Sequence, residues 1–339
     1  MCPQDQNAAG LQAVLLVNTG TPAAPTKAAV VPYLRHFLLD RRIVNLPPLL
    51  WRPVLEAFVL RIRPAKTVRI YQSIWTENGS PYTLHSAALE AGLQQQLAGS
   101  GIDVCLAQRY GAPSMAALLG QFAAEGHQRL LVIPLYPQSA LATTGSVHDE
   151  LDRQLTRLDY HPELQFIEDY HLHSGYLQAI ADSICPHLRT VQGQRPHLVL
   201  SFHSIPLKDQ RHGDSYATQV AATCLHIAQR LGLAAGEWEY VFQSRFDDTQ
   251  RWLGPFLEHR VDELLNAGKR NLVIACPGFA VDCTETLYDI QLDLIGAMHS
   301  RLRAAGEDSS GLSMKYVPCL NALPAHIAAL TDLIRQNLL

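Results

Sequence analysis

Short runs of apolar side chains, many of them β-branched, recur along the chain and are separated by longer stretches with helical periodicity. Near-continuous apolar runs of this length are typical of strands buried on both faces, as in parallel sheets covered by helices. Eight such runs predict an α/β protein with two open sheets of about four strands each. The runs are residues 13–17, 103–107, 130–135 and 164–167, then 197–201, 239–242, 272–276 and 315–317.

An internal similarity supports the division into two halves. Residues 13–22 (AVLLVNTGTP) resemble residues 197–206 (HLVLSFHSIP), and residues 131–138 (LVIPLYPQ) resemble residues 272–279 (LVIACPGF). The two matching segments lie about 43 residues further apart in the first half than in the second. The extra residues are assigned to 33–82, and a long insertion of this kind in a compact domain is often a lid or a binding lip. We call residues 33–82 the lip.

Composition and charge narrow the class of protein. The chain has 339 residues, of which 47% are hydrophobic and 17% charged, so it can fill sizeable cores. The net charge is -4 and no run of Lys or Arg is longer than two, so the sequence has no basic segment typical of nucleic-acid binding. The first twelve residues lack the pattern of an export signal, and no stretch is apolar enough to span a bilayer. We expect a soluble cytoplasmic protein.

Seven scattered cysteines, with no CxxC pair, argue against both a disulfide framework and a closed structural zinc site. Most are expected to be small buried hydrophobic residues.

The most informative polar residues follow the strands, because ligands of open α/β sheets bind beyond the carboxyl ends of the strands. No GxGxxG or GxxxxGK[ST] motif occurs, which disfavours dinucleotide and P-loop chemistry. His203 comes directly after the strand 197–201 and is placed to act as a base or metal ligand near neutral pH. The alternative is a loop histidine hydrogen-bonded to the backbone.

A row of carboxylates follows the strand 272–276. Glu285, Asp289 and Asp293 are spaced by four and four, which places them on one face of a helix. The row suits conduction of cations or protons, although a solvated acidic helix face would look similar. Together with His203, Glu285 makes an incomplete site that fits a borderline divalent ion such as Fe²⁺ in transit.

The start of the lip mixes arginines with large apolar side chains. Arg35, Arg41, Arg42 and Arg52 lie among leucines and aromatic residues. Such a surface suits a flat hydrophobic ligand that bears carboxylates, since Arg binds carboxylates bidentately. An ordinary amphipathic helix and peripheral contact with a membrane both remain open.

These residues carry a resemblance to the ferrochelatases, specifically the protoporphyrin type of Gram-negative bacteria. The similar segments are LLVNTGTPAAPT, YLRHFLLDRRIVNLP, YQSIWTENGSPY, RYGAPS, VIPLYPQ with TTGS, SFHSIP, FQSRF, CPGFAVDCTETLYDI and YVPCLN, which together run from residue 15 to 321. The resemblance implies two Rossmann-like domains with a cleft between them. It implies a lyase that inserts Fe²⁺ into protoporphyrin IX to give protohaem, the last step of haem b biosynthesis.

The resemblance also assigns residues. The family's catalytic histidine falls on His203 and its glutamate on Glu285, both named as iron-site residues, and the acidic row continues at Asp289 and Asp293. Whether His203 binds iron, takes protons or does both stays open, as does whether the row carries iron or protons.

Porphyrin contacts are implied in the lip and at two further positions. Arg35 is a candidate partner for a propionate, and Ser80 and Tyr136 are further candidates. The segment YPQSALATTGS departs from the family's commoner aromatic–Ser run, so the porphyrin wall there is expected to differ. No cysteine follows Cys319, so no [2Fe–2S] cluster and no other tightly bound cofactor is expected, and Fe²⁺ is a substrate.

The resemblance gives domain limits of 11–168 and 169–317, with 318–339 packing back on the first domain. Rival interpretations are a cobalt or nickel chelatase for a more reduced tetrapyrrole, a coproporphyrin-accepting ferrochelatase, a tetrapyrrole carrier, and a generic two-domain small-molecule binding protein. The sequence does not decide the oligomeric state or the preference between Fe²⁺ and Zn²⁺.

Overall fold

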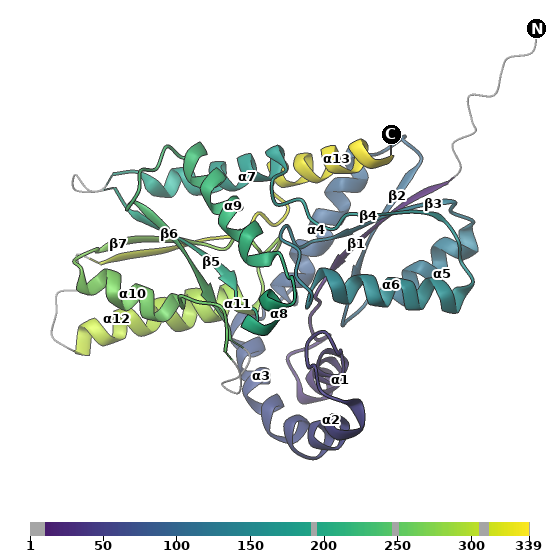
Figure 1. Cartoon of the computed structure of the whole chain (residues 1–339), viewed down its shortest axis with the longest axis horizontal. Coiled ribbons are helices and arrows are strands. Elements are labelled where there is room, and N and C mark those ends of the chain that lie inside the picture. The colour runs from purple at the N-terminus through teal and green to yellow at the C-terminus, as the bar shows by residue number, and fades with distance from the viewer. Residues whose placement is uncertain (1–10, 191–194, 246–250, 305–311, 339) are drawn as a thin grey trace, which may run out of the picture.

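The computed structural model describes residues 11–190, 195–245, 251–304 and 312–338 (Figure 1). It contains two four-stranded parallel sheets with the same strand order, β2-β1-β3-β4 and β6-β5-β7-β8. The predicted fold class, two α/β sheets flanked by helices, is confirmed. The strands are β1 (Gln12–Asn18), β2 (Ile102–Gln108), β3 (Arg129–Pro134), β4 (Glu163–Phe166), β5 (His197–His203), β6 (Trp238–Gln243), β7 (Asn271–Ala275) and β8 (Ser313–Val317).

The first sheet shows why its central strand is continuously apolar. Every residue of β1 is buried. Val14 and Leu16 pack on one side in a core that includes residues of both halves of the chain, while Leu15 and Val17 pack on the other side with α5 (Met115–Glu125) and α6 (Thr144–Leu158). A strand covered on both faces needs apolar side chains at odd and even positions alike.

One hydrophobic core runs through both domains. It joins one side of each sheet to α4 (Pro81–Gln96), α7 (Ser174–Ile184), α9 (Tyr216–Arg230) and α13 (Pro324–Leu338). The C-terminal helix α13 packs against both α7 and α4, so it contacts the first domain, and Figure 1 shows it along the same side as α7. The far side of the second sheet is covered by α10 (Leu257–Asn266) and by the helix that ends in α12 (Ile295–Ala304). The domain limits themselves stay a prediction.

The lip is the main difference between the halves. One helix pair, α8 (Leu207–Arg211) and α9, connects β5 to β6, whereas the connection from β1 to β2 holds α1 (Lys27–Leu38), α2 (Pro48–Val54), a π-helix (Leu55–Val59), α3 (Leu60–Ile74) and α4. The extra elements project away from the sheets in Figure 1 and have a small core of their own, which includes Leu34, Leu55 and Tyr71.

The described cysteines are all free. Cys2 and most of the segment on which the expectation of no export signal rests lie outside the described residues. Within the described part of the chain, none of the helices has the length and apolar character needed to cross a membrane.

Candidate active site

A large cavity opens where the carboxyl ends of both sheets meet the lip. Its empty volume, open solvent included, is about 1840 Å³. The wall from the second domain includes His203 and Glu285, and the wall from the first domain includes Ser80 and Tyr136. The structure therefore brings together four of the residues predicted as site residues, from segments up to 205 positions apart.

His203 is the last residue of β5 and is half-buried in the cavity wall. Its Nδ1 lies 2.7 Å from the carbonyl oxygen of Ser204, and its own carbonyl accepts a hydrogen bond from the Tyr216 hydroxyl at 3.0 Å. A carbonyl can only accept, so Nδ1 carries a proton, and in the neutral ring the lone pair is therefore on Nε2. No described residue is hydrogen-bonded to Nε2, which leaves it available as a base or ligand.

Glu285 lies in the short helix α11 (Thr284–Thr286) that follows the loop after β7. Its backbone is held by Gln243, which is 1% exposed and donates from Nε2 to the Glu285 carbonyl at 2.7 Å. Ser201 in turn donates to Oε1 of Gln243 at 2.5 Å. A buried glutamine thus ties the strand that carries His203 to the turn that carries Glu285. Gln243 was not among the predicted site residues, and its place at the end of β6 was the available signal.

The acidic row lies on a helix, as predicted, but most of it is a π-helix (Leu287–Leu294) rather than an α-helix. π-Helical turns inside α-helices are rare and are frequent at functional sites. Asp289 is half-buried, its Oδ2 accepts from the Ser244 hydroxyl at 2.8 Å, and Asp293 is exposed. Burial, reinforced by the nearby charge of Glu285, raises the pKa of Asp289 to about 6.

Tyrosines dominate the wall that the first domain and the lip contribute. The Tyr136 hydroxyl pairs with Thr19 Oγ1 at 2.8 Å, and the Tyr82 hydroxyl accepts from the Gly20 amide at 2.7 Å. Burial raises the pKa of both phenols, so they stay uncharged at neutral pH. Gly20, at φ +109°, permits this close turn because a side chain there would meet Gln108. The tyrosine part of this wall is therefore aromatic, with neutral hydroxyl groups.

The side chain of Arg35 lies on the surface of the lip and does not line the cavity. Its guanidinium forms a bidentate pair with Glu56, with distances of 2.7 and 3.0 Å, and Arg35 is not among the residues that line the cavity. The arginines that do line it are Arg41, Arg42 and Arg109. A lip helix presents only part of its circumference to the cavity, and the partner of Arg35, 21 residues along the chain, could not be read from spacing.

Cys283 also lines the cavity, beside Glu285. Burial raises the pKa of its thiol, so the side chain is neutral. The sequence analysis treated the cysteines as core residues. A cysteine two residues before a predicted site glutamate was the signal that this one faces the cavity.

Away from the cavity, one group within the described ranges has the spacing of metal ligands: Asp103, Glu125 and His127. It lies where β2 and β3 begin, at the opposite edge of the sheet from the cavity. Among the residues described, His203 and Glu285 do not belong to a group of three of this kind, and the predicted incomplete site stays a prediction.

The fold is that of a two-domain chelatase. SirB from Bacillus subtilis with Fe³⁺ aligns with a TM-score of 0.55 at 12% identity, covering 96% of this chain and 94% of that one. The sirohydrochlorin chelatase SirB from Bacillus subtilis subspecies spizizenii in complex with cobalt aligns with a TM-score of 0.52 at 11% identity, with the same coverage.

The chain belongs to the ferrochelatase family, whose family model matches residues 11–338. A ferrochelatase from Nitrosococcus oceani is 42% identical over 327 residues, covering 96% of this chain and 86% of the relative. One from Aromatoleum aromaticum is 41% identical over 328 residues, covering 96% and 87%. Ferrochelatase 1 from Shewanella oneidensis is 40% identical over 327 residues, covering 96% and 95%.

Proposed function

We propose that this protein is an enzyme that inserts Fe²⁺ into protoporphyrin IX, with release of the two pyrrole protons, to form protohaem. Membership of the ferrochelatase family supports this function. The observation that carries it is the pairing of two unlike walls: a tyrosine-rich wall bordered by arginines, and a wall that presents a free imidazole nitrogen and a carboxylate.

The aromatic wall serves the macrocycle. A free porphyrin is planar, and iron cannot reach its four nitrogens until the ring bends and two N–H protons leave. Contacts over the remote ring surface can offset strain of roughly 1–5 kcal/mol at the reacting centre. The lip and the second domain are the two surfaces between which the ring is bent.

His203 is the pyrrole-proton acceptor in this proposal. Its Nδ1–H is held by the Ser204 carbonyl, so the neutral ring presents Nε2 as the acceptor and takes up a proton without a change of tautomer. Such a positioned base contributes about 10²–10⁴-fold to rate.

Glu285 and the acidic row carry ions between this site and solvent. Asp289, with a pKa of about 6, changes protonation state near neutral pH and therefore suits proton transfer. Asp293 provides the exposed end of the row. The same carboxylates could bring Fe²⁺ inward, and the kinetics of a Glu285→Gln variant distinguish the two roles.

The direct test is anaerobic incubation of the protein with Fe²⁺ and protoporphyrin IX, following the loss of free-porphyrin fluorescence. Many turnovers per protein molecule support the proposal. Binding that stops at one porphyrin per chain would instead identify a carrier. Parallel incubations with coproporphyrin, and with Zn²⁺, decide the tetrapyrrole and metal preferences.

We further propose that the tip of the lip contacts a membrane surface. Leu49, Leu50, Phe58 and Ile62 are 90%, 69%, 63% and 74% exposed, with Arg52 exposed among them. Clustered apolar side chains with a cation suit the interface of an anionic bilayer. Co-sedimentation with vesicles of phosphatidylglycerol and phosphatidylethanolamine tests this: Leu49→Asp with Phe58→Asp should abolish it, while Leu164→Asp, an exposed leucine in β4, should not.

A further inference from the structure

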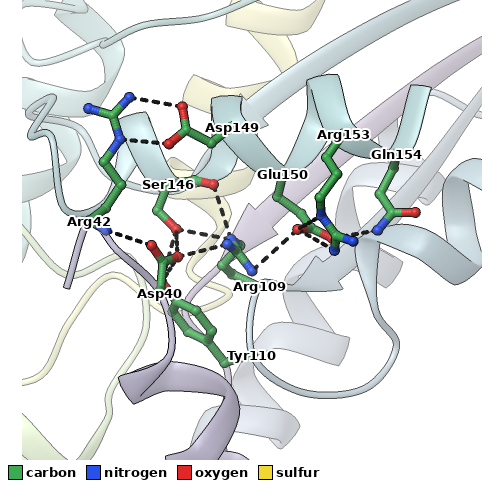
Figure 2. A network of polar contacts seen from close by, with 9 residues as sticks. All are labelled: Asp40, Arg42, Arg109, Tyr110, Ser146, Asp149, Glu150, Arg153 and Gln154. Atoms are coloured by element: carbon green, nitrogen blue, oxygen red, sulfur yellow. Dashed lines mark hydrogen bonds and ion pairs between the residues drawn. The ribbon is translucent and has the colours of Figure 1, made fainter. Parts of the chain in front are cut away.

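A polar network in the cavity wall joins the lip to the rest of the first domain (Figure 2). At its centre is Asp40, two residues after α1, whose side chain is 7% exposed. Its Oδ2 accepts hydrogen bonds from Arg109 Nη2 at 2.7 Å, the Tyr110 hydroxyl at 2.8 Å and Ser146 Oγ at 2.6 Å. Three donors, from the end of β2 and the first turn of α6, thus converge on one oxygen of the lip.

The other oxygen of Asp40 organises the lip itself. Oδ1 accepts from the backbone amide of Arg42 at 2.8 Å, and the Asp40 carbonyl accepts from the amides of Ile43 and Val44. The turn built on these bonds carries Arg41, Arg42 and Ile43 to the rim of the cavity. Asp40 is not itself a cavity-lining residue. One carboxylate therefore both shapes the rim and fixes it to the domain.

The charges in the network make Asp40 hard to replace. Glu150, the other carboxylate near Arg109, lies 3.8 Å from Nη1 and is already held by Arg153 and Gln154, each at 2.7 Å. Asp40 is the close counter-charge of a guanidinium that is 9% exposed. Removing one partner of such a pair leaves a buried charge uncompensated, which is strongly unfavourable. Movement of the lip away from this position would leave the buried charge of Arg109 without a close counter-charge.

We propose that Asp40 is a positioning residue for metal insertion: it holds the rim of the lip at the separation from the second domain at which the bound porphyrin is bent. This inference rests on the proposed function. Asp40 touches no substrate and acts through the turn that carries Arg41 and Arg42. Displacing a positioning group by about 1 Å can lower a rate by up to ~10²-fold, so a small movement of the rim is sufficient.

The test compares Asp40→Asn with Asp149→Asn. Both variants remove a carboxylate charge that pairs with an arginine at this rim, and both keep the size of the side chain. Asp149 forms a bidentate pair with Arg42, at 2.7 and 2.8 Å, but it is 52% exposed and lies outside the cavity wall. It is therefore a matched control for charge alone. Each protein is assayed for KM of porphyrin, KM of Fe²⁺ and kcat, and for the out-of-plane Raman bands of bound protoporphyrin IX without iron.

We expect Asp40→Asn to lower kcat/KM for porphyrin ~10–100-fold, to leave KM for Fe²⁺ within about 2-fold, and to weaken the out-of-plane bands. Asp149→Asn should stay within about 2-fold of the parent in every quantity, as an exposed pair does. Loss of active protein with both KM values and the Raman bands unchanged would mean a purely structural role and would overturn the inference. An equal effect of Asp149→Asn would overturn it as well.

Ser146→Ala keeps the test decisive if Asp40→Asn does not fold. It removes one of the three donors to Oδ2 and leaves the charge pair intact, so porphyrin kcat/KM should fall ~2–10-fold with the same weakening of the bands. An unchanged Ser146→Ala spectrum would count against the inference. Failure of the proposed function is recognised separately, because the parent protein would then bind protoporphyrin IX without turning it over with Fe²⁺.

Discussion

The two sheets have the same strand order but place different chemistry at their carboxyl ends. Thr19 follows β1 at the position that His203 holds in β5, as the internal similarity aligns them. The Thr19 hydroxyl is bonded to Tyr136, whereas His203 keeps a free Nε2. The first domain and the lip thus provide hydrogen-bonded tyrosines with arginines at the rim, and the second domain provides an imidazole and a carboxylate. In the proposed function, the first domain and the lip shape the porphyrin, and the second domain takes up its protons.

The largest loss of activity is expected when His203, the proposed base of the second domain, is removed. We expect His203→Ala to reduce turnover by ~10²–10⁴-fold or more, because no other imidazole lines the described cavity wall. Affinity for protoporphyrin IX should stay within about 3-fold, since the opposite wall supplies most of the ring contact. Stopped-flow fluorescence measures both quantities.

His161→Ala is the control for that experiment, because His161 is an exposed histidine outside the cavity and its side chain is 79% accessible. It should behave as the parent protein does. A His203→Ala variant that kept most of its activity would refute the assignment of the base to the second domain.

Glu285→Gln should be the next largest change, with a loss of ~10²-fold in kcat/KM for Fe²⁺. The substitution preserves the shape and leaves the backbone bond to Gln243 in place. If the carboxylate passes iron inward, KM for Fe²⁺ rises and excess Fe²⁺ restores part of the rate. If it passes protons outward, kcat falls with KM unchanged. Steady-state kinetics over a range of Fe²⁺ concentrations distinguishes these results, and an unaltered kcat and KM would exclude both.

Asp289→Asn is expected to change the free energy of unfolding, by an amount that depends on pH. The folded pKa of about 6 lies above the ordinary value near 4, so the folded state binds the proton more tightly than the unfolded chain. The corresponding stability is fully present below about pH 4 and is lost as the pH rises through about 6. The variant should therefore gain about 1–3 kcal/mol of unfolding free energy at pH 7.5 relative to the parent, and no gain at pH 4.

Chemical denaturation at both pH values measures this difference. Asp293→Asn is the control, because that carboxylate is exposed and should change stability little at either pH. Equal stabilisation of Asp289→Asn at pH 4 and 7.5 would contradict an origin in proton binding.

Much of this arrangement could be predicted from the sequence. All eight strands lie within two residues of their predicted ends, and the central strands β1 and β5 show why, because a strand buried on both faces has a continuous apolar run in its sequence. His203 and Glu285 were found because strand ends of parallel sheets meet at one edge. The π-helix was missed because its hydrogen-bond pattern differs from that of an α-helix without a distinct sequence signal. The Asp40–Arg109 pair spans 69 residues and depends on how the lip folds back.

The smallest effect is expected at Arg35, the propionate partner suggested by the family resemblance. Its pair with Glu56 lies on the surface of the lip, with both side chains nearly half exposed, and such pairs contribute little. Arg35→Ala should change KM for protoporphyrin IX by less than about 2-fold. Arg41 lines the cavity and has no carboxylate partner among the described residues, so Arg41→Ala should raise that KM several-fold. Steady-state assays of the two variants rank them. A larger effect at Arg35 would mean that the outer face of the lip turns toward the porphyrin. The lip would then have to move when the porphyrin binds, and the first domain would not act as a fixed wall.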